Sequence, residues 1–215
     1  LDEEDVNGAT TLNTDLKAYA SRDGGTTFTQ MTLADQGFLL PNPGNDIYTK
    51  LMLHMDGANA GTTFTDSSDS AYSITRNSGT TQTAIKKFGT ASCYQDGTGT
   101  DTIGQLSIAN SSDWDFGTGE FTIDFWLYLF TLGSNLNQKI IGCSNYSGGW
   151  NGWHLAKDYG NMNIKWEGGN NTTAFNTSGS TPIVAETWTH VALVKSGTTT
   201  KLYFDGVEKF SLAQN

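Results

Sequence analysis

The sequence predicts an all-β protein, a two-sheet antiparallel sandwich with little helix, and three observations support this. The 215 residues include 25 Gly and only 3 Pro, and only 16% are charged. That composition is typical of short strands joined by tight turns, whereas helices favour Ala, Leu, Glu and Lys. From Tyr48 onward, strand-like segments bounded by Gly, Asp or Asn follow one another, with turn residues about every 8–12 positions. No segment keeps an apolar period of 3.6 residues.

The N-terminal part of the chain differs from the rest. Residues 1–40 are interpreted as a small β module or the tail of an upstream domain, because Leu16–Ser21 and Thr26–Leu33 flank a turn at Arg22–Gly25. Residues 41–47 hold two prolines and a glycine and are interpreted as a linker. The main domain is expected over residues 48–215.

The clearest predicted strand of the main domain is Phe121–Tyr128. Phe121, Ile123, Phe125 and Leu127 point to one face of such a strand, and the polar face carries Asp124 and Trp126 with their neighbours. A hairpin loop is expected at Ser196–Thr200. The other predicted strands are Lys50–Met55, Ala71–Thr75, Ala91–Tyr94, Leu106–Ile108, Lys139–Cys143, Gly152–Ala156, Asn163–Trp166, Thr187–Lys195 and Lys201–Gly206.

Charge and cysteine content restrict the classes of function. The net charge is −10, with 22 acidic residues against 12 Lys and Arg, which argues against a nucleic-acid partner. No apolar stretch approaches the roughly 20 residues of a transmembrane helix. Cys93 and Cys143 lack the spacing of a zinc site, so either a disulfide or a pair of buried free thiols is expected.

Six motifs occur in a fixed order across residues 50–208: Leu51–Gly57, Phe64–Ser68, Lys87–Ser92, Phe116–Trp126, Trp188–Lys195 and Leu202–Val207. Together they resemble the laminin-G-like, concanavalin A-like jelly-roll superfamily. The resemblance implies a jelly-roll sandwich over about residues 48–210. Its members usually continue past the Asp205-Gly206 turn into closing strands, which we expect to be missing here. Residues 14–33 are similar to short β modules of phage tail and virion proteins, which implies a viral surface or appendage protein.

Glycan binding is the leading functional hypothesis. Sugars stack their apolar faces on exposed aromatic rings, while amides and carboxylates bind their hydroxyls. Tyr146, Trp150 and Trp153 are interleaved with Asn and Gly, and Asp124 and Trp126 share the polar face of one strand. These five residues are the predicted ligand-binding residues. Two further tryptophans, Trp166 and Trp188, lie in apolar strands and are assigned to the core.

Asp56 and Asp66 are the candidate ligands of a structural Ca²⁺ ion. Both lie in loop-like contexts, and Ca²⁺ prefers hard oxygen ligands of this kind. The resemblance also implies one structural Ca²⁺ near the loops at the strand edges. The alternative is that these carboxylates only form Asx-turns.

Catalysis is not expected. Glycoside hydrolysis needs two carboxyl groups about 5–5.5 Å or about 6.5–9.5 Å apart. Glu120 and Asp124 share a face but are four residues apart, hence roughly 13 Å at the rise of a strand. His54, His154 and His190 lie in predicted strands among apolar residues and are assigned to packing or hydrogen bonding.

We therefore predict a non-enzymatic virion surface or tail-appendage protein with a lectin-like module for glycan adhesion or assembly. Its expected partners are a glycan or cell-surface polysaccharide and other virion or surface proteins, within a homo-oligomeric assembly. Its expected location is the virion surface or the extracellular space. The alternative is a secreted cellular carbohydrate-binding or adhesin module, and the third possibility is a glycan-active hydrolase.

Overall fold

The chain divides into two compact units, Leu1–Asp46 and Ile47–Asn215. A computed structural model describes residues 18–20, 26–32, 46–95, 106–130, 138–145, 151–158, 163–170, 173–178 and 182–213. In the first unit, β1 (Ala18–Ala20) pairs antiparallel with β2 (Thr29–Met31). This confirms the predicted N-terminal hairpin, whose expected turn at Arg22–Gly25 lies outside the described residues.

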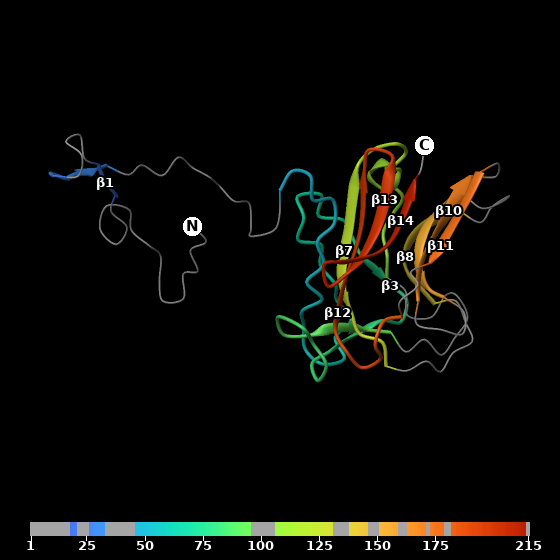
Figure 1. Cartoon of the computed structure of the whole chain (residues 1–215). Helices are drawn as coiled ribbons and strands as arrows, with labels where there is room; N and C mark the ends of the chain where they lie inside the picture. Colours follow the sequence, from blue (N-terminus) through green and yellow to red (C-terminus); the bar gives the residue numbers. More distant parts are fainter. Residues whose placement is uncertain are drawn as a thin grey trace. The chain divides into compact units, whose positions relative to one another are not determined.

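The second unit contains two four-stranded antiparallel sheets, which confirms the predicted sandwich (Figure 1). One sheet has the order β14-β13-β12-β7 and the other the order β11-β10-β9-β8. Their strands are β7 (Phe121–Leu127), β8 (Gln138–Asn145), β9 (Asn151–Lys157), β10 (Ile164–Asn170), β11 (Thr173–Ser178), β12 (Thr189–Ser196), β13 (Thr199–Phe204) and β14 (Val207–Ala213). Strand β11 was not predicted.

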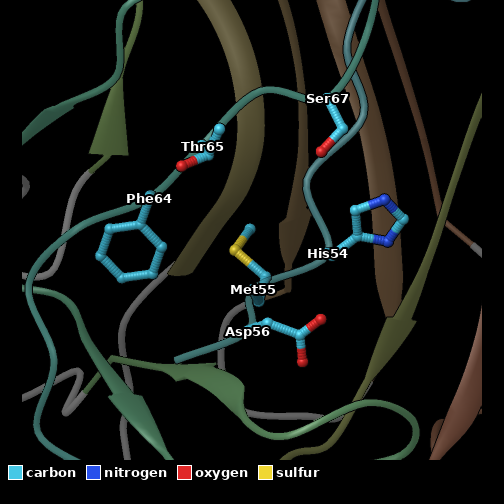
Figure 2. Close-up of a pocket in the computed structure, with 6 residues that line it drawn as sticks. All are labelled: His54, Met55, Asp56, Phe64, Thr65 and Ser67. Atoms are coloured by element: carbon cyan, nitrogen blue, oxygen red, sulfur yellow. The ribbon is translucent and has the colours of Figure 1, made fainter. Parts of the chain in front are cut away.

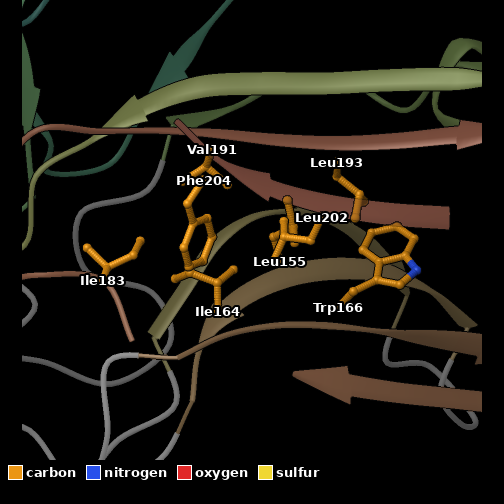
Figure 3. Close-up of a cluster of buried hydrophobic side chains, with 8 residues drawn as sticks. All are labelled: Leu155, Ile164, Trp166, Ile183, Val191, Leu193, Leu202 and Phe204. Atoms are coloured by element: carbon orange, nitrogen blue, oxygen red, sulfur yellow. The ribbon is translucent and has the colours of Figure 1, made fainter. Parts of the chain in front are cut away.

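The core lies between these two sheets, where strands of each contribute apolar side chains (Figure 3). Leu193 and Leu202 of one sheet and Leu155 and Ile164 of the other are fully buried. The whole buried cluster is Leu155, Ile164, Trp166, Ile183, Val191, Leu193, Leu202 and Phe204. On β7, exposure alternates at every residue, as predicted: Phe121, Ile123, Phe125 and Leu127 pack on the core, and the residues between them are exposed.

Strands β13 and β14 are joined by a two-residue turn, Asp205-Gly206. Both residues have positive φ angles, 47° and 77°, as a type I′ hairpin turn requires. The turn is also tied to β12, because the backbone N–H of His190 donates to Asp205 Oδ1 at 2.9 Å. The expectation that no strand follows this turn was wrong, since β14 pairs along β13. The β12–β13 loop is shorter than predicted and consists of Gly197 and Thr198.

Between Ile47 and β7, the described residues 47–95 and 106–120 are mostly irregular. Within these two ranges lie four short strands and one 3₁₀ turn: β3 (Thr75–Arg76), β4 (Thr80–Gln82), β5 (Ser92–Tyr94), β6 (Leu106–Ser107) and η1 (Ser112–Trp114). Of these, β4 was not predicted, and β3 shares only Thr75 with the strand predicted at Ala71–Thr75.

The strand predicted at Lys50–Met55 is reduced to an isolated bridge between Leu53 and Asp66. The backbone N–H of Met52 bonds to the Asp66 side chain instead of a neighbouring strand, and Met55 has a φ of 60°. His54 is therefore exposed and outside any strand, contrary to its assignment. Among the described residues, no helix is long and apolar enough to cross a membrane.

Leu193→Ala is expected to lower the free energy of unfolding by about 2–5 kcal/mol, because it leaves a cavity between the sheets. Chemical denaturation measures this change. Val207→Ala is the matched control, since Val207 is 58% exposed and should shift the free energy by no more than about 0.5 kcal/mol. Equal effects of the two substitutions would contradict the placement of the core.

Candidate functional site

The outer face of β7 and β12 carries a group of polar and aromatic side chains. Trp126 of β7 lies opposite His190 of β12 in the register, on the side away from the core residues Phe125 and Val191. The His190 and Trp126 rings are 5.3 Å apart, and His190 Nε2 lies 3.3 Å from Asp124 Oδ2. The Asp124 side chain is 61% exposed. The structure therefore brings the two predicted residues Asp124 and Trp126 together and adds His190.

Two residues from the irregular segment complete this group. The Phe88 ring meets Trp126 edge to face at 5.6 Å. The Lys87 ammonium lies 4.2 Å from the centroid of the Trp126 ring, which is a cation–π contact. Phe88 is 66% exposed and Trp126 is 36% exposed, so both residues keep solvent-accessible surface. We call Lys87, Phe88, Asp124, Trp126 and His190 the Trp126 cluster.

Asp56 anchors the turn that carries Lys87 and Phe88. The backbone N–H and the hydroxyl of Thr90 both donate to Asp56 Oδ1, and the Gly57 N–H donates to Thr90 Oγ1 at 3.0 Å. Gly89 has a φ of 59°, and a side chain there would also meet the Asp56 carboxylate. The N–H of Thr90 is the main cause that lowers the pKa of Asp56. The carboxylate thus organises a loop, a role that sequence reasoning missed.

Asp66, the second predicted metal ligand, is a buried structural carboxylate. Its Oδ1 accepts from the N–H groups of Met52 and Ser68, each at 2.9 Å. Its Oδ2 accepts from the Ser68 hydroxyl at 2.8 Å and the Tyr72 N–H at 2.9 Å. Burial raises the pKa of Asp66, but these hydrogen bonds outweigh it and the pKa is lowered. Four donors on its two oxygens give Asp66 a structural role, and its assignment to Ca²⁺ stays a prediction.

A pocket of about 250 Å³ lies beside Asp56 (Figure 2). Two neighbouring segments line it, one with His54, Met55 and Asp56 and the other with Phe64, Thr65 and Ser67. Within the part of the chain that the structure describes, no group of three or more His, Cys, Asp or Glu side chains could hold a metal ion. A Ca²⁺ ion at Asp56 stays a prediction.

A second aromatic group lies next to the Trp126 cluster. Tyr128 contacts both Trp188 and Phe130, with ring centroids 5.4 and 5.2 Å apart, and Phe130 contacts Tyr94 at 5.6 Å. We call Tyr94, Tyr128, Phe130 and Trp188 the Phe130 group. Trp188 was assigned to the core, but it is only half-buried and belongs to this group. Trp188 lies just before the first residue of β12, and its ring contacts Tyr128.

The other predicted sugar-binding loop is not supported by its one described residue. Trp153 stacks on Phe116 at 4.8 Å and packs against Trp166 and the core. Its indole N–H donates to the Trp114 carbonyl at 2.9 Å. Trp153 is thus a packing residue, and we leave it out of the candidate site. Tyr146 and Trp150 lie outside the described residues. Trp166 is 2% exposed, as its assignment to the core requires.

A polar cluster lies on the face of β9 and β10 that is opposite to the core. His154 Nε2 and Lys165 Nζ both lie 2.9 Å from Glu167 Oε2. Burial lowers the pKa of His154, although Glu167 opposes this. The predicted hydrogen-bonding role of this histidine is confirmed.

Both cysteines carry free thiols and are partly buried, which decides between the two alternatives left open by their spacing. Burial raises the pKa of Cys93 and of Cys143. A raised pKa leaves less of the reactive thiolate at neutral pH.

We expect the stability of the domain to fall in acid. The pKa values of Asp56 and Asp66 are below 3.8 in the folded protein, so their contribution is complete above pH 3.8 and is lost as the pH falls through the lowered values. Asp66→Ala should lose on the order of 3 kcal/mol at neutral pH, because three backbone N–H groups lose their acceptor. Thermal melting between neutral and acidic pH measures both effects. An Asp66→Ala variant as stable as the wild type would contradict this structural role.

A match to a family model agrees with this fold. Residues 100–215 match the family model described as the concanavalin A-like lectin/glucanases superfamily. No curated protein matches the chain. A crystal structure of an S-layer domain-containing protein (residues 221–444) from Clostridium thermocellum ATCC 27405 is similar, with 20% sequence identity, a TM-score of 0.46, and coverage of 76% of this chain and 72% of that chain. The likeness of residues 14–33 to virion modules is untested by these matches. Since the family model covers more than half of its residues, the chain belongs to the concanavalin A-like lectin/glucanase superfamily.

Proposed function

We propose that this protein is a non-enzymatic adhesion module that binds a glycan at the Trp126 cluster. The observation that carries the proposal is the half-exposed Trp126 ring, surrounded by charged side chains on the outer face of β7 and β12. Its setting, in this proposal, is a virion surface or another extracellular surface. The virion setting rests on the sequence resemblance of residues 14–33, and the same site would serve a secreted cellular adhesin.

The chemistry of the Trp126 cluster suits a sugar. The C–H face of a sugar ring is apolar and packs on an aromatic ring, whereas its hydroxyls need both donors and acceptors. Asp124 supplies an acceptor, Lys87 supplies donors, and His190 supplies one or the other according to its tautomer. Binding sites for small molecules combine apolar surface with a few placed polar groups in this way.

The carboxylates near the site support a role without catalysis. Glu120 accepts hydrogen bonds from the Gly197 N–H at 3.0 Å and the Ser196 hydroxyl at 3.2 Å, at the turn between β12 and β13. Asp124 instead faces His190. The rise of a strand places these two carboxyl-bearing residues roughly 13 Å apart, beyond the separation that glycoside hydrolysis needs. Glu167 lies on the other sheet, in contact with Lys165 and His154.

Trp126→Ala should lower the affinity for the glycan by about tenfold or more, because it removes the aromatic surface on which the sugar stacks. An array of cell-surface glycans identifies a binder, and calorimetry compares the variants. Tyr48→Ala is the matched control, since Tyr48 is a 78% exposed aromatic residue outside the cluster. The proposal fails if the wild-type protein binds no glycan, or if both variants bind as tightly as the wild type.

Asp56→Ala should weaken binding several-fold while Trp126 itself stays in place. Without the carboxylate, the Gly89–Thr90 turn loses two hydrogen bonds, so Lys87 and Phe88 are held less firmly over Trp126. Calorimetry measures the affinity, and the quenching of tryptophan fluorescence by iodide reports how far Trp126 becomes exposed. Unchanged affinity and quenching would show that Asp56 does not position these residues.

A further inference from the structure

The aromatic side chains at the candidate site continue as one row beyond Trp126. Tyr128 follows Trp126 by two residues, directly after β7 ends at Leu127, and Trp188 precedes His190 by two residues, directly before β12 begins at Thr189. Their rings contact each other, with centroids 5.4 Å apart, and two residues of extended chain span roughly 7 Å. The Phe130 group therefore lies just beyond the paired ends of β7 and β12, where the Trp126 cluster also lies.

One short segment borders both ends of this row. Phe88 meets Trp126 edge to face, and Tyr94, six residues later, meets Phe130 edge to face at 5.6 Å. Residues 87–94 thus contact the Trp126 cluster at one end and the Phe130 group at the other. Four rings keep large exposed surfaces along it: Phe88 66%, Trp126 36%, Phe130 41% and Tyr94 37%. Exposed aromatic surface is therefore present in both groups and is not confined to the Trp126 cluster.

The two halves of the row differ in charge. The Trp126 cluster holds Lys87, Asp124 and His190, whereas the Phe130 group consists of four aromatic residues, with hydroxyls on Tyr94 and Tyr128. A ligand that covers both halves would meet hydrogen-bonding and charged groups at one end and mainly ring surface at the other. A chain of linked sugars, with an apolar face on each unit, fits such a row.

We propose that Tyr94, Tyr128, Phe130 and Trp188 form a second sugar subsite beside the Trp126 cluster, so that the ligand is an internal stretch of a polysaccharide chain. This inference rests on the proposed glycan binding and extends it from a single sugar to a polymer. A protein partner is less well supported, because a stable protein interface buries about 800 Å² on each side. Such an interface involves about 20–30 residues on each side, whereas four exposed rings carry this surface.

The test titrates the protein with saccharides of increasing length, from monosaccharide to hexasaccharide. The probes are oligosaccharides of β-linked glucose, of β-linked N-acetylglucosamine, of β-linked mannose and of α-linked galacturonate. Calorimetry measures the affinity for each member of each series. In a series that binds, the affinity should rise about tenfold or more from the monosaccharide to the longer members. Phe130→Ala should cut the affinity for the long members by about fivefold to tenfold and leave monosaccharide binding unchanged.

Trp126→Ala and Tyr48→Ala complete the design. Trp126→Ala should weaken binding at every length, and Tyr48→Ala at none. An affinity that does not depend on length, or a length dependence that Phe130→Ala and Tyr94→Ala both leave intact, overturns the second subsite while glycan binding stands. No binding by any series, together with a negative glycan array, overturns both proposals. Circular dichroism and melting curves confirm that each variant is folded.

Discussion

The packing of two sheets against each other is the constraint on which the rest of this structure depends. Leu193 and Leu202 from one sheet and Leu155 and Ile164 from the other exclude water completely. Because side chains alternate along a strand, burying one face of β7 and β12 forces the next residues outward. Asp124, Trp126 and His190 are exposed together for that reason, and the candidate site is a direct consequence of the core.

Carboxylates organise the loops around this framework. Asp66 receives four hydrogen bonds from the irregular segment, Asp56 holds the turn at Thr90, and Asp205 fixes the β13–β14 turn to β12. Each accepts at least one backbone N–H hydrogen bond, so side chains tie these loops where regular strand pairing is sparse. Through Asp56 this network extends to the site, since the turn it holds places Lys87 and Phe88 beside Trp126.

The aromatic residues of the domain serve two different purposes. Trp153 and Trp166 pack with Phe116 and Phe121 against the core, where their area stabilises the sandwich. Trp126 lies on the outer face, in contact with a cation and with rings from a distant part of the chain. The same residue type, tryptophan, thus stabilises the core on one face of a strand and lines the candidate site on the other.

The sequence by itself determined the β-sandwich, the alternation along β7, and the exposure of Asp124 and Trp126, because these follow from local periodicity and turn residues. Only the tertiary structure decided the roles of Asp56, Asp66, Trp153 and Trp188. An aspartate in a loop looks the same whether it binds a cation or receives backbone N–H groups from residues far along the chain. The apolar run around Trp188 does not tell whether its ring reaches the core or the Phe130 group. Its partners come from segments distant in sequence, as Lys87 and Phe88 do for Trp126, and only folding brings them together.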